Sequence, residues 1–294
     1  MVDELVLARP DWQSRARAHR DRIEALIAPY LDAHRRGDKH PVIDFLFTYY
    51  SARPGQVMRW HPGYGVALAQ AHRYRELRGY VCDDRDTARV SREHLISRLH
   101  LVRWILDMER ATAGRAPRLS CFGLHEWAMV YRTGEKRHEV PLRLGSAGTD
   151  AVVEAHPLRC THFDAFRFFT EDAVPLNATP LSRADALANE QPGCLHANMD
   201  LYRYCLKLTP LIPGDLLAEC FELAFTARAL DMRASPYDLS SYGYRPVPIE
   251  TPDGRAQYVR EQTAIARRGQ ELREVLVTTC EDLLAAAGET PDLR

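Results

Sequence analysis

The sequence predicts a mainly α-helical protein, organised as a single α-helical domain with a small β-sheet or hairpin element. Two observations carry this prediction: long segments place apolar residues at helical spacing among charges, and only a few short runs have strand character. The chain has 294 residues, 46% hydrophobic and 27% charged, which is the composition of a compact globular protein. No repeat or linker divides it, so we expect one domain over residues 1–294.

The helical pattern occurs in five segments, which span Asp11–Arg36, Glu93–Arg110, Cys194–Leu208, Asp215–Met232 and Ala256–Ala287. In each, apolar side chains recur every three or four positions and so lie on one helix face. The breaker Pro192-Gly193 precedes the third helix, and Pro210 follows it. In the second helix we expect one buried face, made of Leu95, Leu99, Val102, Trp104 and Leu106.

Strand character is limited to three short runs, Val140–Leu144, Ala151–Ala155 and Pro246–Thr251. The dipeptide Asp253-Gly254, which follows the third run, is typical of a tight turn. These runs predict the small sheet or hairpin beside the helices.

Charge, cysteine content and hydropathy narrow the class of protein. The chain has 39 Lys and Arg residues against 40 Asp and Glu, and this balance does not indicate a nucleic-acid partner, although a local basic patch could supply one. Seven cysteines without a Cys-x-x-Cys pair indicate reduced thiols and not a disulfide framework or zinc knuckle. No apolar stretch approaches the ~18 residues of a membrane span, so we expect a cytoplasmic protein without a membrane partner.

The strongest candidate for a cofactor ligand lies in the third helix. His196 and Asp200 are four residues apart, so they share one helix face, with Arg203 beside them. A carboxylate can hold one ring nitrogen of a histidine and leave the other for a metal or haem iron. Arg233, near the end of the next helix, is a candidate for binding a carboxylate of cofactor or substrate. The alternative is an ordinary His–Asp pair on a helix surface.

Two further histidines are candidates for acid–base chemistry. His162 is followed closely by Asp164, and His125 is followed directly by Glu126. His125 lacks the second histidine of an H-E-x-x-H zinc motif, but Glu126 in apolar surroundings could have a raised pKa. The alternative is structural, with each histidine satisfying a backbone carbonyl in the core.

Aromatic side chains are concentrated near these titratable residues, a mixture that surface helices do not need. We expect five of them to form a dry pocket that binds an aromatic substrate: Phe45, Tyr49, Trp60, Phe166 and Phe169.

The segment Val57–Ala69 contains Pro62-Gly63-Tyr64-Gly65 followed by small residues, and it resembles the helix–hairpin–helix signature. In base-excision glycosylases of that superfamily the hairpin binds DNA phosphates through backbone N–H groups, and a catalytic aspartate follows along the chain. Asp84 and Asp86 fall in the corresponding window. Fewer residues precede the hairpin here than the helices of that superfamily need, and Pro-Gly-x-Gly is also a common turn.

Six blocks spread over most of the chain carry a family resemblance: His40–Arg53, Trp60–Gly65, Cys121–Arg132, Cys160–Thr170, Gln191–Leu208 and Leu230–Thr251. Together they resemble a bacterial family usually labelled 3-methyladenine DNA glycosylase. The resemblance implies an N-glycosylase that removes alkylated purines, with Asp84 or Asp86 stabilising an oxocarbenium-like transition state. Trp60 or Tyr64 would stack on the extruded base.

The chain also has a weaker resemblance to the histidine-ligated haem oxygenases that hydroxylate aromatic amino acids, such as the tyrosine hydroxylases of antibiotic pathways. It rests on size, α-rich character and the candidate axial ligand His196. Because the chain lacks Cys-x-x-Cys-His, the implied haem b would be held non-covalently. A non-haem iron is the alternative cofactor.

Three functions therefore compete. The first expectation is an oxidoreductase acting on a small aromatic molecule such as an aromatic amino acid, with iron or haem on His196 and acid–base chemistry by His162 or His125. The second is the N-glycosylase, and the third is a non-catalytic binding protein. A homodimer is compatible with each of them.

Overall fold

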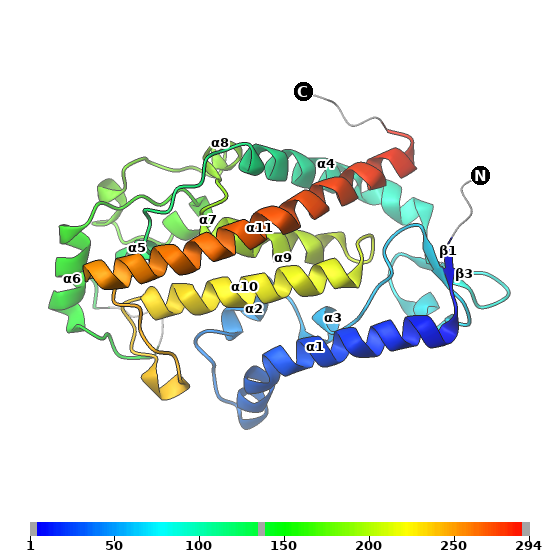
Figure 1. Ribbon diagram of the computed structural model, residues 1–294, viewed down its shortest axis with the longest axis horizontal. Coiled ribbons are helices and arrows are strands. Elements are labelled where there is room, and N and C mark those ends of the chain that lie inside the picture. Colours follow the sequence, from blue (N-terminus) through cyan, green and yellow to red (C-terminus); the bar gives the residue numbers. More distant parts are fainter. Residues whose placement is uncertain (1–4, 135–138, 290–294) are drawn as a thin grey trace. The chain divides into compact units, whose positions relative to one another are not determined.

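The computed structural model describes residues 5–134 and 139–289 of the chain. It is mainly helical, with 59% helix and a small four-stranded sheet, so the predicted fold class is confirmed (Figure 1). Its α-helices are α1 (Arg9–Arg36), α2 (Asp44–Thr48), α3 (Pro54–Val57), α4 (Arg92–Ala113), α5 (Leu124–Ala128), α6 (Gly145–Ala155), α7 (Phe163–Phe166), α8 (Ala186–Asn189), α9 (Leu195–Leu208), α10 (Gly214–Ala234) and α11 (Pro252–Ala287). The strands are β1 (Leu5–Leu7), β2 (Val66–Leu68), β3 (Tyr80–Cys82) and β4 (Ala88–Val90), and the 3-10 helices are η1 (His72–Glu76), η2 (Val174–Leu176) and η3 (Ser240–Tyr242). Among the described residues, no helix combines the length and the apolar character needed to cross a bilayer.

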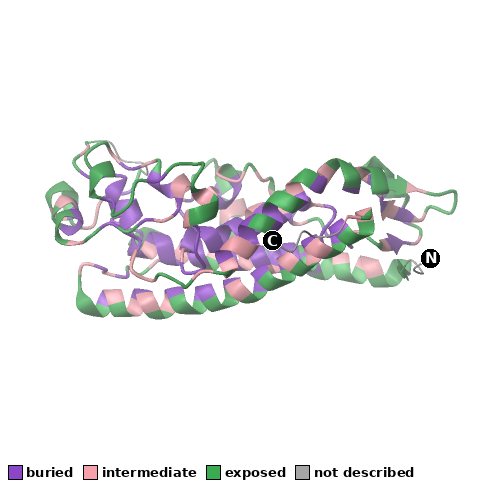
Figure 2. Ribbon diagram, turned by 90° about the horizontal axis from the view of Figure 1, so that it is seen from above, coloured by how far each residue is buried: buried purple, intermediate pink, exposed green. Residues whose placement is uncertain are grey.

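The helices α1, α4, α9, α10 and α11 confirm the five that the periodicity predicts. Their ends follow local chemistry: Pro10 opens α1, and Gly37 closes it in the left-handed conformation with φ 78°. Buried residues recur along one side of the long helices and exposed residues along the other (Figure 2). The expected burial of Trp104 is wrong, because its side chain is 49% exposed and the neighbouring Ile105 occupies the buried face of α4.

The three predicted strands are wrong. Ala151–Ala155 belongs to helix α6, because a short apolar run fits a buried helix as well as a strand. Val140–Leu144 makes only one isolated bridge, from Leu142 to Tyr237. Pro246–Thr251 is unpaired chain that leads into α11, and the expected turn Asp253-Gly254 lies inside that helix.

The sheet consists instead of four three-residue strands in the order β1-β2-β4-β3. Strands β1 and β2 are parallel, with Leu5 opposite Val66, and β4 is antiparallel to both β2 and β3. The helix expected after the Pro-Gly-Tyr-Gly turn is therefore absent, because Val66–Leu68 pairs with β1 as a strand. The helix–hairpin–helix interpretation of Val57–Ala69 is wrong.

The chain groups into two compact units. Unit 1 comprises Met1–Arg110, Leu201–Glu222 and Leu272–Arg294, and unit 2 comprises Ala111–Asp200 and Leu223–Glu271. The helices α4, α9, α10 and α11 each contribute residues to both. The expectation of one domain over residues 1–294 stays a prediction.

A buried ion pair joins α4 to α11 within unit 1. Nε of Arg273 donates to Oε2 of Glu109 over 2.7 Å, and the two side chains are 0% and 2% exposed. Charges removed from water to this extent depend on each other, since neither can regain its hydration in the folded state.

We expect Arg273→Met to lower the free energy of unfolding by about 3–5 kcal/mol, because Glu109 is left charged and buried. The double variant Glu109→Met/Arg273→Met should recover most of that loss, since no buried charge remains. Arg268→Met on the same helix is the control, because it breaks a pair about half exposed and should change stability by about 0.5 kcal/mol at most. Urea unfolding measures all three, and equal losses for Arg273→Met and Arg268→Met would contradict the account.

Candidate metal centre

The candidate centre lies in unit 2, where histidines from three segments meet. His125 is in α5, His196 is in the first turn of α9, and His162 directly precedes α7. The ring of His196 meets the ring of His125 edge-on, with centroids 4.7 Å apart, and stacks on that of His162 at 5.1 Å. All three side chains are buried. The sequence singled out each histidine separately, and the fold gathers them into one cluster.

A sharp backbone turn positions His125. Phe122 has φ 51° and Gly123 has φ 71°, the left-handed region that side chains disfavour. A Cβ atom on Gly123 would also lie 3.3 Å from Cβ of Ala234. Glycine is therefore suited to this position by both its backbone conformation and the close neighbour, and the chain enters α5 immediately after it.

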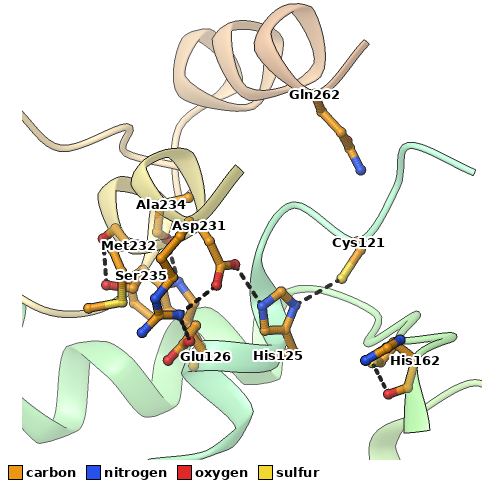
Figure 3. A network of polar contacts seen from close by, with 12 residues as sticks. Cys121, His125, Glu126, His162, Asp231, Met232, Ala234, Ser235 and Gln262 are labelled. Carbon is orange, nitrogen blue, oxygen red and sulfur yellow. Dashed lines mark hydrogen bonds and ion pairs between the residues drawn. The ribbon is translucent and has the colours of Figure 1, made fainter. Parts of the chain in front are cut away.

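The carboxylate in contact with His125 belongs to Asp231 on α10. Its Oδ1 lies 2.7 Å from Nε2 of His125, and its Oδ2 accepts a hydrogen bond of 2.9 Å from Nη1 of Arg228. The same Nη1 donates to Oε1 of Glu126 over 2.8 Å. On its other side His125 meets Cys121, with Nδ1 3.4 Å from Sγ (Figure 3). The charged groups are all buried, so they form one mutually dependent network.

The sequence predicts Asp200 as the carboxylate beside His196, and it does not single out Asp231, which contacts His125. Asp200 is buried on α9, and its charge contributes to the raised pKa of His162. The sequence does contain a signal for Arg228 and Asp231. These charged residues are three positions apart in a helix, and the residues next to them are apolar: Ala227, Leu230 and Met232. Charges spaced this way on a buried helix face need partners from another element.

A second group of donors lies beside the first. Nδ1 of His162 is 2.8 Å from Oε1 of Glu190, and Cys194 supplies a third donor atom. The donor atoms of these three residues all lie within 4.8 Å of one another. Glu190 and Cys194 lie on either side of Pro192-Gly193, which the sequence marks only as a helix breaker. Their proximity to His162 follows from the tertiary fold and not from a local pattern.

Burial and neighbouring charges give the three histidines different pKa values. Burial alone would lower the pKa of His125, but the Asp231 carboxylate raises it well above its usual value. Burial likewise opposes the charged form of His162, and Glu190 nevertheless raises its pKa to about 9. Burial, together with the positive charges of these two rings, holds the pKa of His196 well below its usual value. At neutral pH His196 is therefore an uncharged imidazole, the form that binds a metal.

The first group has a donor set suited to a transition metal. His125, His196 and Asp231 each offer one ligand atom, and these atoms all lie within 4.8 Å of one another. Two imidazole nitrogens and one carboxylate oxygen are the protein ligands of many non-haem Fe(II) sites, and imidazole also suits zinc and copper. The set comes from α5, α9 and α10, so only the folded chain can form it.

A small cavity adjoins the cluster. Its volume is about 10 Å³, and its lining consists of Cys121, His125, Cys160, Thr161, Gln191, Cys194, Leu195, His196, Tyr258 and Gln262. A space of this size holds about one water molecule. A haem needs a pocket of several hundred cubic ångströms, so the residues around His196 do not fit haem b, whereas they fit a metal ion with one small ligand.

Several predicted site residues lie elsewhere. Phe45, Tyr49, Trp60 and Arg203 are in unit 1. Trp60 is buried, and its Nε1 donates to Asp215 over 3.4 Å.

Four further predicted residues, Asp164, Phe166, Phe169 and Arg233, are in unit 2 but outside the cavity lining. Phe166 and Phe169 are buried against each other, with ring centroids 5.1 Å apart. Asp164 pairs with Arg167 at 3.3 Å, and Arg233 pairs with Glu261 at 2.7 Å. The aromatic side chain that does line the cavity is Tyr258.

Replacing Asp231 with leucine should lower the free energy of unfolding of the metal-free protein by about 3–5 kcal/mol, because His125 and Arg228 lose a buried partner. Asp172→Leu is the control, since Asp172 and its partner Arg132 are both more than half exposed and 3.8 Å apart. We expect no resolvable change for the control in urea unfolding with chelator present, because solvent screens this pair. A loss for Asp231→Leu no greater than that of the control would show that the network carries no stability.

No family model matches this chain, and neither the curated proteins nor the solved structures contain a match. The resemblances to the glycosylase-labelled family and to the haem oxygenases stay expectations.

Proposed function

We propose that the chain is a metal-dependent oxidoreductase whose metal ion is held by His125, His196 and Asp231. The observation that carries the proposal is the convergence of two buried imidazoles and one buried carboxylate on a single point from three helices. An iron ion in this donor set would supply the capacity to bind and reduce dioxygen. The cavity beside His196 is too small for haem b. Of the two cofactors that the sequence suggested, haem b and non-haem iron, we therefore propose non-haem iron.

The residues around the ligands support this assignment. Arg228 holds Oδ2 of Asp231, which fixes the direction of the ligand oxygen Oδ1. When Nε2 of His125 faces a metal, its Nδ1 carries the proton and donates toward Sγ of Cys121, 3.4 Å away. Partners of this kind hold the tautomer and the ring orientation of a metal-binding histidine.

His162 has the position and the charge of an acid–base group. It stacks on His196 and keeps a proton at Nδ1 against Oε1 of Glu190, 2.8 Å away. A proton held there lies beside the ligand set, where it can be delivered to a group that becomes negatively charged. We therefore assign to His162 the role of general acid, as the sequence suggested.

A small aromatic molecule remains the proposed substrate. Tyr258 lines the cavity, and its ring meets that of Phe122 at 6.2 Å, so one wall is aromatic. The volume of about 10 Å³ admits no aromatic ring in this conformation. Substrate entry therefore requires lining side chains to move, and Gln262 is the candidate because it is held by one hydrogen bond to the carbonyl of Gly193.

The N-glycosylase alternative has no comparable support. Asp84 and Asp86 are exposed in the connection between β3 and β4, and neither belongs to the lining of the cavity beside His196. The segment thought to bind DNA phosphates contributes strand β2 to the sheet. The non-catalytic alternative predicts the same cluster without metal binding, so metal analysis separates it from the proposal.

We expect the protein, purified without chelator, to contain about one equivalent of metal per chain by mass spectrometric metal analysis. His196→Ala and Asp231→Asn should each lower the metal content at least about tenfold, because each removes one of three protein ligands. His100→Ala, an exposed histidine of α4, is the matched control and should keep the full content. Chelator should lower the unfolding temperature of the wild type and of His100→Ala, but not that of His196→Ala. A metal-free wild type that also takes up no Fe(II) anaerobically would refute the proposal.

The haem alternative is tested on protein expressed with haem precursor and iron. We expect no Soret band, and we expect Fe(II)-loaded protein to consume dioxygen faster when an aromatic amino acid is added. A Soret band lost in His196→Ala would contradict the non-haem assignment.

A further inference from the structure

The second donor group of unit 2 has the composition of a metal site of its own. It consists of His162, Glu190 and Cys194, whose ligand atoms all lie within 4.8 Å of one another. The histidine and glutamate side chains are buried, and the cysteine is half-buried. The ligand atoms of a tetrahedral zinc ion are about 3.3–3.8 Å apart, so small side-chain shifts bring these three donors to coordination distance.

A tight turn holds two of the three donors in place. The carbonyl of Glu190 accepts a hydrogen bond of 2.8 Å from Nη1 of Arg115. The backbone N–H of Cys194 donates to the carbonyl of Gln191 over 3.1 Å, and Oε1 of Gln191 accepts from the N–H of Gly193 over 2.8 Å. The side chains of Glu190 and Cys194 therefore extend from one well-held piece of backbone.

One ligand atom of the group has no partner. Oε1 of Glu190 faces Nδ1 of His162 at 2.8 Å, but Oε2 is buried and has no hydrogen-bond partner in the part of the chain that the structure describes. A buried carboxylate oxygen without a partner destabilises the folded state, and such an oxygen often marks the place of a water molecule or an ion. Glu190 thus offers a ligand atom that no neighbouring side chain uses.

We infer that His162, Glu190 and Cys194 form a second metal site, which binds Zn²⁺. Thiolate, imidazole and carboxylate are the ligands that zinc takes in proteins, and a thiolate favours zinc over magnesium or calcium. The charges also match, because the carboxylate of Glu190 and the thiolate of Cys194 together balance a divalent cation in a place that excludes water. The cavity of about 10 Å³, which Cys194 lines, has room for one water molecule as the fourth ligand.

Zinc in this site would inhibit the proposed reaction. His162 and Cys194 each release a proton to solvent when they bind a cation, whereas His196 in the first group is already neutral. We therefore expect the second site to fill only when zinc is added to the purified protein. Bound zinc then takes the place of the proton of His162, which removes the general acid. This consequence rests on the proposed function, but zinc binding itself does not.

The test of binding is a titration of the metal-free, full-length protein with Co²⁺, because a cobalt–thiolate bond absorbs in the near ultraviolet by charge transfer. The wild type and Asp231→Asn, which is weakened at the first group, should both show this absorption, and added zinc should remove it. Cys194→Ser should abolish the absorption, and Glu190→Gln should weaken cobalt binding at least about tenfold, because each removes one of three ligands. Cys82→Ser is the matched control, since Cys82 is also half-buried but lies in unit 1, and it should keep the absorption.

A second measurement needs no variant. Zinc should slow the alkylation of Cys194 by iodoacetamide in the wild type, and it should leave the alkylation of Cys82 unchanged, with both read from peptide masses. Three results would each overturn the inference: no cobalt–thiolate absorption in the wild type, an absorption that persists in Cys194→Ser, or a Cys194 that zinc does not protect.

The inhibitory role is tested on iron-loaded protein with an aromatic amino acid. Zinc should slow dioxygen consumption by the wild type, and it should not slow that of Cys194→Ser below the zinc-free rate of the same variant. Equal slowing of both proteins would contradict the inhibitory role, because zinc would then act at the first group. If the iron-loaded protein consumes no dioxygen, the proposed function fails, and the cobalt and alkylation results still decide whether the second site exists.

Discussion

The buried carboxylate of Asp231 is the constraint on which the candidate centre depends. It contacts His125 through one oxygen and Arg228 through the other, and Arg228 in turn holds Glu126. The Asp231 side chain is 0% exposed, so it depends on these partners. A buried charge without a partner destabilises the folded state by more than most single interactions stabilise it. The positions of α5 and α10 in unit 2 are therefore fixed together, and the ring of His125 is fixed with them.

The same arrangement leaves His196 in the protonation state that the proposed metal ion requires. His196 lies between two rings whose pKa values are raised, and its own pKa is lowered, so it offers a lone pair without first losing a proton. The proton between His125 and Asp231 now compensates the negative charge of the carboxylate. A divalent cation bound to both residues would displace this proton and compensate the charge in its place. His162 has a raised pKa beside Glu190 and stacks on His196, so it would place a protonated imidazole beside the proposed ligands.

The fold was predictable where the signal is local. Five long helices follow from apolar periodicity, whereas strands of three residues owe their existence to partners such as Leu5 and Val66, which are far apart in sequence. The site follows the same rule. Histidines at positions 125, 162 and 196 stand out by residue type, but the carboxylate that each one meets depends on packing. The spacing on α9 pointed to Asp200 as the partner of His196, and it gave no sign that Asp231 on α10 would contact His125. Packing also separates the five aromatic residues predicted to form one pocket, because Phe45, Tyr49 and Trp60 are in unit 1 and Phe166 and Phe169 are in unit 2.

Anomalous X-ray scattering from crystals of the iron-loaded protein tests the central claim most directly. The account predicts a single strong peak at the iron edge, within about 2.0–2.2 Å of one nitrogen each of His125 and His196 and one oxygen of Asp231. A peak held by other side chains, or no peak in crystals of protein shown to contain iron, would contradict the assignment of this cluster as the metal centre.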